Sequence, residues 1–174
     1  MSALPDFETV VRQYHRDLYH FAFSLAGNEA DASDLMQQTF YIWASKGSQL
    51  RDPASAKRWL FTTLHREFLQ TLRRRNRFQE YQLDEVRTEL PEVASDVVAR
   101  LDGATVLELL SRLEERYRAP LALYYMEDYS YLEIGALLEI PLGTVQSRIA
   151  RGKAHLLEML TGSSKAEFIK GDQS

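Results

Sequence analysis

The chain has 174 residues, contains no cysteine and carries a formal net charge of −4 at pH 7. The lack of cysteine excludes disulfides, a thiolate nucleophile and a cysteine-based zinc site. Because the N-terminus has no signal-peptide pattern and no apolar stretch reaches about 18 residues, we expect a cytoplasmic protein without membrane insertion. The negative net charge would disfavour nucleic acid, but the charges are segregated along the chain, so local charge matters more.

Two amphipathic helices are predicted at the start of the chain. Asp6 begins the first helix, in which apolar residues recur at helical spacing, and Gly27 ends it. Asn28 or Asp31 caps the second helix, which runs to about residue 44.

The second helix carries polar and aromatic residues outside its apolar stripe. Asp34, Gln37, Phe40 and Tyr41 point largely away from the side that its main apolar residues form. An exposed face that combines amides with aromatic rings is typical of a protein–protein interface. Packing against another helix of the same bundle would explain the same pattern, and the pattern alone does not separate the two interpretations.

A third predicted helix is strongly basic. An Asp-Pro pair begins it, and the chain from Arg51 to Arg77 contains eight basic and two acidic residues, a local charge of +6. Basic residues at a helix C-terminus also complement the helix dipole, but eight are more than that role needs. Exposed aromatic rings among basic residues can stack on unpaired bases, and Trp59 and Phe61 are the candidates for such exposed rings.

The charge reverses in the next segment. Residues 80–100 contain six acidic and two basic residues, with Pro91 and no sustained periodicity, which is typical of a linker. A second helical domain begins near Asp102, with one helix around Leu109 and another that starts at Pro120. Patterns typical of β-strands are absent, so both domains are predicted to be all-α.

A helix-turn-helix pattern starts at Ser130. Ser130 and Glu133 form a capping box at the start of a short helix. Pro141 ends this helix, because proline lacks an N–H donor and disfavours the helical state of the residue before it. A longer basic helix begins near residue 143 or 144, and a short helix, a tight turn and a second helix together are typical of the DNA-binding motif.

The longer helix has an apolar stripe opposite a side of small and polar residues. The stripe contains Gly152, which predicts close approach to another helix. The opposite side is narrow enough to enter a major groove and supplies donors for base edges and phosphates. An amphipathic helix with a solvated basic face would show the same pattern. The stripe is Val145, Ile149, Gly152 and Leu156, the opposite side is Ser147, Ala150, Arg151 and Ala154, and Gln146 and Arg148 lie on the flanks.

The sequence contains no catalytic or metal-binding constellation. Its four histidines lack metal-ligand spacing, and its carboxylates are scattered over predicted helix surfaces. We therefore expect no enzyme activity, no metal site and no cofactor, with the histidines solvated or at interfaces.

Two motifs resemble parts of a known family. The run Asp31-Ala-Ser-Asp-Leu-Met-Gln-Gln-Thr-Phe40, the run Trp59-Leu-Phe-Thr-Thr-Leu and the arginines after it resemble region 2 of the bacterial extracytoplasmic-function (ECF) sigma factors, in the sigma-70 superfamily. The runs that begin at Glu115 and Pro141 resemble region 4 of the same family.

The resemblance implies an all-α fold of two small domains joined by a flexible acidic linker. It also implies a transcription initiation factor that binds core RNA polymerase and directs it to promoter DNA. Typical members answer to an anti-sigma factor as well, which nothing in the sequence identifies. Region 2 would occupy residues 1–78 and would bind core polymerase and recognise and open the −10 element. The linker would occupy residues 79–102. Region 4 would occupy residues 103–162 and read the −35 duplex, and residues 163–174 would form a disordered tail.

The resemblance assigns residues to three contacts. Arg66 departs from the family pattern, because many relatives have asparagine at this position of the −10 region. The residues assigned to core polymerase are Asp31, Asp34, Leu35, Gln37 and Phe40; those assigned to the −10 strand are Arg58, Trp59, Thr62, His65, Arg66, Arg73, Arg74, Arg75 and Arg77; those assigned to the −35 element are Thr144, Gln146, Ser147, Arg148, Ala150, Arg151 and Lys153.

A stand-alone helix-turn-helix regulator with a ligand-sensing N-terminal half is the main alternative. It explains residues 103–160 but neither the arginine-rich helix nor the face with Asp34 and Gln37. Such a regulator binds duplex DNA without polymerase, usually as a dimer, whereas a sigma factor needs the polymerase. An enzyme with a DNA-binding tail is a third alternative, which the lack of a catalytic cluster disfavours.

Overall fold

The computed structural model describes residues 5–75, 98 and 100–170, and the side chains of this part up to residue 162. All regular secondary structure in these residues is helical, which confirms the predicted all-α fold. In chain order the helices are α1 (Phe7–Ala26), α2 (Glu29–Lys46), the 3-10 turns η1 (Gly47–Gln49) and η2 (Pro53–Ser55), α3 (Ala56–Arg74), α5 (Gly103–Ser111), α6 (Glu115–Met126), α7 (Tyr131–Leu138) and α8 (Leu142–Lys170).

The ends of the first two helices follow from capping groups in the sequence. The side chain of Asp6 accepts a hydrogen bond from the Thr9 N–H at 2.8 Å and so begins α1. Gly27 ends α1 with a φ of 75°, a left-handed conformation that glycine adopts without steric cost. Of the two predicted caps of α2, Asn28 is the one observed, and it accepts from the Asp31 N–H at 2.9 Å.

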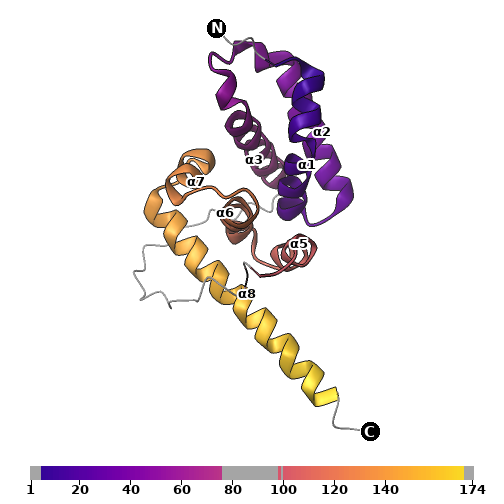
Figure 1. The fold of residues 1–174 in the computed structure, drawn as a ribbon, viewed down its shortest axis with the longest axis vertical. Helices are drawn as coiled ribbons and strands as arrows, with labels where there is room; N and C mark the ends of the chain where they lie inside the picture. The colour runs from indigo at the N-terminus through magenta and orange to yellow at the C-terminus, as the bar shows by residue number, and fades with distance from the viewer. Residues whose placement is uncertain (1–4, 76–97, 99, 171–174) are drawn as a thin grey trace.

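Helices α1, α2 and α3 form a three-helix bundle around a common apolar core, at one end of the molecule (Figure 1). Leu18, Phe21, Leu60 and Phe61 are at most 1% exposed there, and the rings of Phe21 and Phe61 stack with their centroids 5.1 Å apart. Phe61 is therefore a core residue, and the prediction that it lies exposed among the basic residues is wrong.

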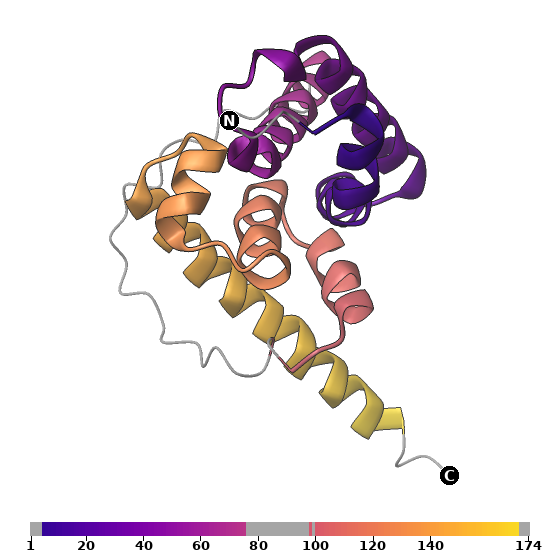
Figure 2. The ribbon, with the colours of Figure 1, turned by 45° about the horizontal axis from the view of Figure 1, so that its top comes forward.

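Helix α6 is the centre of the second half. It packs on α5, α7 and α8, and its other side contacts α1, so that it lies between the first bundle and α8 (Figure 2). Gly152 permits the close packing of α8 on α6, because a Cβ atom at this position would lie 2.5 Å from Leu121 Cδ1. The close approach predicted at Gly152 is thus confirmed.

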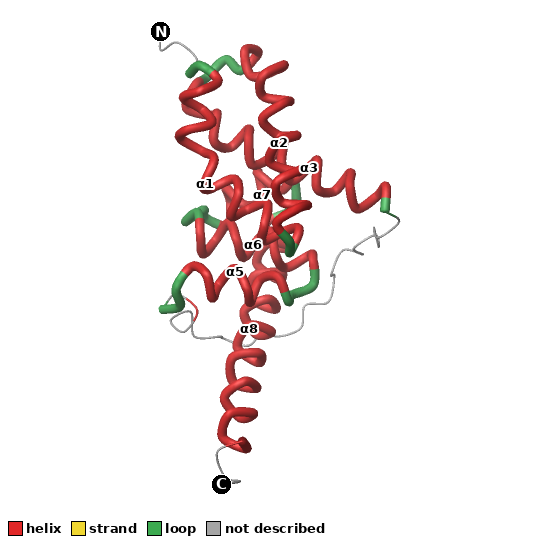
Figure 3. Tube along the Cα trace, turned by 90° about the vertical axis from the view of Figure 1, so that its right-hand side faces the viewer, coloured by secondary structure: helices red, strands yellow, loops and turns green. Residues whose placement is uncertain are grey.

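Three boundaries differ from the prediction. Helix α6 starts at Glu115, so Pro120 lies inside the helix instead of at its start, and the ring costs one hydrogen bond in its second turn. Helix α8 continues to Lys170 and extends away from the rest of the molecule (Figure 3). This corrects the predicted disordered tail for residues 163–170. Residues 79–97 and 99 of the predicted linker lie outside the described residues.

The two halves of the chain pack against each other. Helix α1 contacts α5 and α6, and α3 contacts α7. The buried apolar side chains of both halves belong to one hydrophobic cluster. Among the described residues, no helix is both long enough and apolar enough to cross a membrane.

Replacement by valine should have opposite effects on stability at Gly152 and Gly162, two of the three glycines in α8. Gly152→Val should lower the free energy of unfolding by about 2 kcal/mol or more, because the new side chain collides with Leu121 in a filled core. Gly162→Val serves as the matched control, since a Cβ there meets nothing within 4 Å, and it should leave stability equal or higher. Urea denaturation of both variants checks this, and equal effects would contradict the packing of α8 on α6.

Candidate nucleic-acid interface

The turn between α7 and α8 is built from local hydrogen bonds. The predicted capping box is present: Ser130 N–H donates to Glu133 Oε2 at 2.8 Å, and Glu133 N–H donates to Ser130 Oγ at 3.3 Å. Glu139 ends α7 with a φ of 59°. A residue with a side chain costs about 1 kcal/mol in this left-handed region, where glycine is the usual choice. The turn that presents α8 is therefore defined, and Glu139 adopts an unfavourable conformation in it.

Helix α8 presents its residues largely as its sequence pattern predicts. Val145 and Ile149 are fully buried, which places the apolar stripe against the core. Gln146 is exposed, while Arg148 and Arg151 are half-buried. Thr144 and Ala150 of the predicted −35 set are also half-buried. The side of α8 that would enter a groove is thus only partly accessible in this conformation.

Two residues of the predicted −35 set have buried polar groups. Lys153 is 8% exposed, and its ammonium lies 4.6 Å from the centre of the Tyr124 ring, a cation–π contact. The hydroxyl of Ser147 is buried and has no hydrogen-bond partner among the described residues. The side chain of Lys153 therefore points into the domain rather than outward, and its contact with DNA remains only a prediction.

The predicted −10 residues on α3 divide into an exposed group and a group that faces the second half. Arg58 is exposed, and Trp59 is half-buried with its ring edge on Trp43, 5.2 Å between centroids. Thr62, in contrast, donates through Oγ1 to the Leu137 carbonyl at 3.3 Å. Leu137 belongs to the last turn of α7, whose carbonyls lack partners within the helix.

Arg66 forms a two-point ion pair across the same interface. Its Nε donates to Glu139 Oε2 at 3.1 Å and its Nη2 to Glu139 Oε1 at 2.5 Å. The hydrogen bond from Arg66 lowers the pKa of the Glu139 carboxyl below its ordinary value. A guanidinium binds a carboxylate here in the fork geometry with which it also binds phosphate or a guanine edge.

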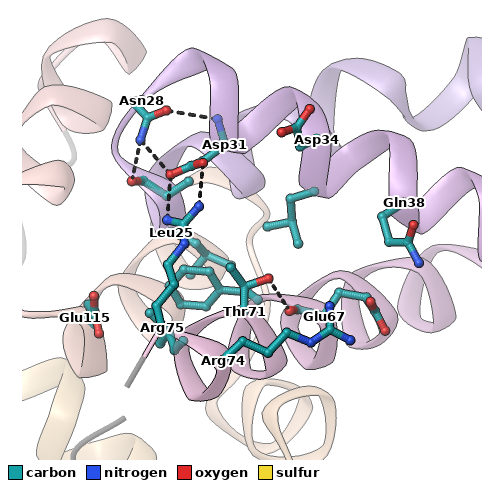
Figure 4. A pocket seen from close by; sticks show the side chains of 14 residues that line it. Leu25, Asn28, Asp31, Asp34, Gln38, Glu67, Thr71, Arg74, Arg75 and Glu115 are labelled. Carbon is teal, nitrogen blue, oxygen red and sulfur yellow. Dashed lines mark hydrogen bonds and ion pairs between the residues drawn. The ribbon is translucent and has the colours of Figure 1, made fainter. Parts of the chain in front are cut away.

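The arginines at the end of α3 behave differently from one another. Arg73 and Arg74 are exposed, and Arg77 lies outside the described residues. Arg75 donates from both terminal nitrogens to the two carboxylate oxygens of Asp31, each at 3.0 Å. This pair joins a predicted −10 residue to a predicted polymerase-binding residue and lines a pocket of about 400 Å³ between α2, α3 and the start of α6 (Figure 4).

The predicted polymerase-binding set separates into surface and core residues. Asp34 and Gln37 are exposed, with Asp34 at the edge of the pocket in Figure 4. Leu35 is 8% exposed and Phe40 7%, so the prediction that Phe40 points away from the core is wrong. Phe40 packs inward with its ring on Phe7, and its neighbour Tyr41 is the exposed aromatic residue, at 69%.

Several interface residues escaped the sequence analysis. Lys57 on α3 lies 2.7 Å from Glu127 at the end of α6 and 3.7 Å from Asp17 on α1. Only 7% of the Glu127 side chain is exposed, and this burial raises the pKa of its carboxyl although the Lys57 ammonium opposes the change. Arg118 on α6 donates to the carbonyl of Leu25 at the end of α1 at 2.9 Å. The sequence signals only the charges of these residues, not their partners.

His65 lies where the two predicted DNA-binding surfaces meet. Burial lowers the pKa of its imidazole from the ordinary 6.5 to about 4; the positive charge of Arg148 on α8 acts in the same direction, and Glu139 opposes both. The imidazole is therefore neutral at pH 7.

Comparison with known proteins identifies the family. The profile described as sigma-70 region 2 matches residues 10–78, and the profile described as sigma-70 region 4 matches residues 104–156. Together the two profiles cover the described helices from α1 to the first half of α8, in the order that the two motifs predict. The chain belongs to the sigma-70 family.

Relatives of this sigma factor match it over most of its length. It is 36% identical to the ECF RNA polymerase sigma factor SigE of Mycolicibacterium smegmatis over 94% of its own length, and it spans 65% of the length of that protein. It is 27% identical to the ECF sigma factor SigW of Bacillus subtilis, with 88% of each chain covered. The family's activity is transcription initiation at promoters with RNA polymerase, which favours this function over that of a stand-alone regulator.

Two solved structures share the fold of this sigma factor. The sigma factor RpoE, in complex with the anti-sigma factor NepR from Bartonella quintana, matches with a TM-score of 0.68 at 27% identity, over 90% of this chain and 97% of that one. CnrH, in complex with the cytosolic domain of CnrY, matches with a TM-score of 0.60 at 25% identity, over 90% of this chain and 88% of CnrH.

The neutral state of His65 predicts how stability depends on pH. Between about pH 6.5 and 4 the folded sigma factor binds fewer protons at His65 than the unfolded chain, so stability is complete above pH 6.5 and falls as the pH falls through this window. We expect a loss of about 1 kcal/mol between pH 7.5 and 5.5. Urea denaturation at both pH values checks this prediction.

The control for this prediction is His65→Gln, which keeps a polar side chain that does not titrate. This variant should remove most of the dependence of the free energy of unfolding on pH between pH 7.5 and 5.5. A smaller dependence should remain from His20, whose pKa is also lowered by burial and by Arg16. An unchanged slope in His65→Gln would show that His65 is not the group that titrates.

Proposed function

We propose that the exposed face of α2, formed by Asp34, Gln37 and Tyr41, binds core RNA polymerase. Its support is that these polar and aromatic side chains lie on the surface, where the family motif of region 2 lies in the sequence. The resemblance also assigns Asp31, Leu35 and Phe40 to this contact. Asp31 lies at the start of α2, paired with Arg75, and Leu35 and Phe40 support the face from below, because both are buried in the bundle.

In the same proposal, α3 captures the −10 element as a single strand. Arg58, Arg73 and Arg74 supply an exposed positive surface for phosphates, and Trp59 supplies an aromatic ring that is half-buried at present. Thr62, His65, Arg66 and Arg75 complete the described part of this set. Their present contacts lie within the protein, so DNA would have to replace those partners.

Helix α8 reads the −35 duplex in this proposal. Its support is the capped helix-turn-helix, which presents Gln146, Arg148 and Arg151 beside small residues. Arg151 lies near the centre of the outward side and Arg148 on its flank. The protein would act in the cytoplasm, where RNA polymerase works, and would have no catalytic activity of its own.

An anti-sigma factor is a further proposed partner. Its support is that RpoE and CnrH, the two solved structures described above, were obtained in complex with NepR and CnrY. The partner of the present chain would have to bind the fold shared with these proteins, and it remains to be identified.

The observation that supports the proposed function best is the pairing of two sigma-70 profiles with two separate basic surfaces, on α3 and α8. Transcription with purified core polymerase on a library of randomised promoters tests it. We expect transcripts from promoters with conserved −35 and −10 sequences that depend on both proteins. Binding of the chain alone to one duplex site, with no effect on transcript selection, would favour the stand-alone regulator.

Substitution of two neighbouring aromatic residues on α2 distinguishes a role in polymerase binding from a role in the core. Tyr41→Ala should weaken binding to core polymerase by about 1–2 kcal/mol and leave stability within about 0.5 kcal/mol, because the side chain is 69% exposed. Phe40→Ala should instead lower the free energy of unfolding by about 3 kcal/mol, because it empties part of the core. Polymerase titration of folded protein and urea denaturation check both. Unchanged affinity for Tyr41→Ala would remove this face from the proposal.

Substitution of two arginines of α8 distinguishes a contact with base edges from a contact with phosphates. Arg151→Ala should relax the preference at particular −35 positions and cost about 1–3 kcal/mol on the best site. Arg148→Ala should weaken all −35 sequences about equally and reduce the salt dependence, as the loss of a phosphate contact does. The promoter library with each mutant holoenzyme measures both effects. Uniform losses for Arg151→Ala would assign the reading to Gln146 and its neighbours instead.

A further inference from the structure

A cavity of about 630 Å³ lies where α1, α5 and α6 meet. The three helices contact one another (Figure 2). The volume is within the range of about 300–1,000 Å³ that binding sites for small organic molecules have. None of the described residues that line the cavity belongs to the proposed polymerase, −10 or −35 contacts. The cavity is thus a feature that the proposed function does not explain.

Apolar side chains form much of the cavity wall. Leu101 precedes α5, Val106 and Leu107 belong to α5, and Met126 is the last residue of α6. Leu101 and Met126 pack against the hydrophobic core but are only partly buried, so that part of their surface faces solvent. An apolar ligand group that packs on these side chains would leave water, which is the main source of affinity in such sites.

Two residues of α1 contribute polar groups to the wall. Arg16 and His20 are four positions apart and therefore lie on the same side of the helix. Arg16 is exposed and forms no ion pair or hydrogen bond with the other described side chains. Burial and the charge of Arg16 lower the pKa of the His20 imidazole, which is therefore neutral at pH 7. The guanidinium of Arg16 is the positive charge that the described part of the wall offers to a ligand.

Tyr125 of α6 adds a hydroxyl that lacks a partner. Tyr125 lines the cavity, and its hydroxyl is buried without a hydrogen bond to any described residue. Burial raises the pKa of this hydroxyl to about 12, so it keeps its proton and can donate. Buried polar groups in folded proteins nearly always have a partner. An acceptor atom on a ligand in the cavity would supply the missing one.

A carboxylate in the wall limits the charge that a ligand can carry. Asp102 caps α5, and its two oxygens accept from the Thr105 N–H at 3.0 Å and from Thr105 Oγ1 at 2.7 Å. These hydrogen bonds lower the pKa of the Asp102 carboxyl, which therefore stays negative at neutral pH. Asp102 would repel a second negative charge on a ligand, whereas a single negative charge can bind at Arg16.

We propose that this cavity binds a small monocarboxylic acid with an apolar body. The carboxylate accepts hydrogen bonds from Arg16 and from the hydroxyl of Tyr125, and the apolar part packs on Leu101, Leu107 and Met126. The inference goes beyond the proposed function and does not depend on it, because the cavity shares no described residue with those contacts. It gives the chain a small-molecule site in addition to its proposed macromolecular partners.

Sodium octanoate is the first probe, because it combines one carboxylate with an unbranched alkyl chain. NMR of the full-length chain with ¹³C-labelled methionine methyl groups shows where it binds, since Met126 lines the cavity while Met36 and Met159 do not. The Met126 signal should shift during the titration, with a Kd on the order of 1 mM. The signals of Met36 and Met159 should stay in place. Equal shifts of all three signals would indicate non-specific binding and overturn the proposal.

Three further probes test the class of ligand. Octanamide, which has the same shape without the charge, should bind about tenfold more weakly than octanoate. Hexanoate should also bind roughly tenfold more weakly, because it buries less of the alkyl chain in the cavity. Octyl phosphate, which has lost most of its second proton at about pH 8, should bind no more tightly than octanoate, because Asp102 repels its second charge. Equal affinities for octanoate and octanamide, or tighter binding of octyl phosphate, would overturn the assignment to a monocarboxylic acid.

Two arginines of α1 form a matched pair of variants. Both are exposed, but only Arg16 lines the cavity. Arg16→Gln should weaken octanoate binding about tenfold and leave octanamide binding unchanged, whereas Arg12→Gln should change neither by more than about twofold. Tyr125→Phe should weaken octanoate binding about threefold to fivefold without lowering stability, because the hydroxyl that it removes has no partner among the described residues. Equal octanoate affinity in the parent chain, Arg16→Gln and Tyr125→Phe would overturn the proposal.

Discussion

The relative position of the two halves depends on a buried ion pair. Lys57 comes from α3 and Glu127 from the end of α6, and Asp17 of α1 lies near the same ammonium. Because the Glu127 carboxylate is almost completely buried, any other packing of the halves would have to bury it unpaired or expose it to water. A pair of this kind restricts the interface to one geometry but adds little net stability, since hydration recovers most of its energy on opening. An interface that contains such an ion pair favours one arrangement of the two halves and can still open and close.

The fold was predictable wherever its cause is local. The N-caps Asp6 and Ser130 and the terminating Gly27 act through hydrogen bonds to residues three or four positions away, so the sequence alone contains the whole interaction. Tertiary packing overrode the local signals elsewhere. Pro120 lies inside α6, which begins at Glu115, and Tyr117 in the turn before the proline is buried in the core.

The candidate site was predictable only as separate helix faces. A helical wheel shows which residues share a side, but it does not show which sides a second element covers. Phe40 looked like a surface residue because α2 alone has two apolar sides, and α1 covers the second one through Phe7. The resemblance assigns Lys153 to DNA, whereas in this structure its ammonium lies on the aromatic rings of α6. Both differences come from partners that are distant in sequence.

The chemistry of Arg66 explains why a basic helix face can bind a carboxylate of its own chain. A guanidinium does not distinguish a carboxylate from a phosphate by charge or by hydrogen-bond geometry, and the chain has 25 acidic residues against 21 basic ones. A basic surface in such a chain binds an internal carboxylate unless the fold keeps the acidic residues away. Here the fold brings Glu139 to Arg66 across 73 positions of sequence. In the proposed function, DNA competes with this single carboxylate through its many phosphates, and it has that advantage when both proposed surfaces bind it together.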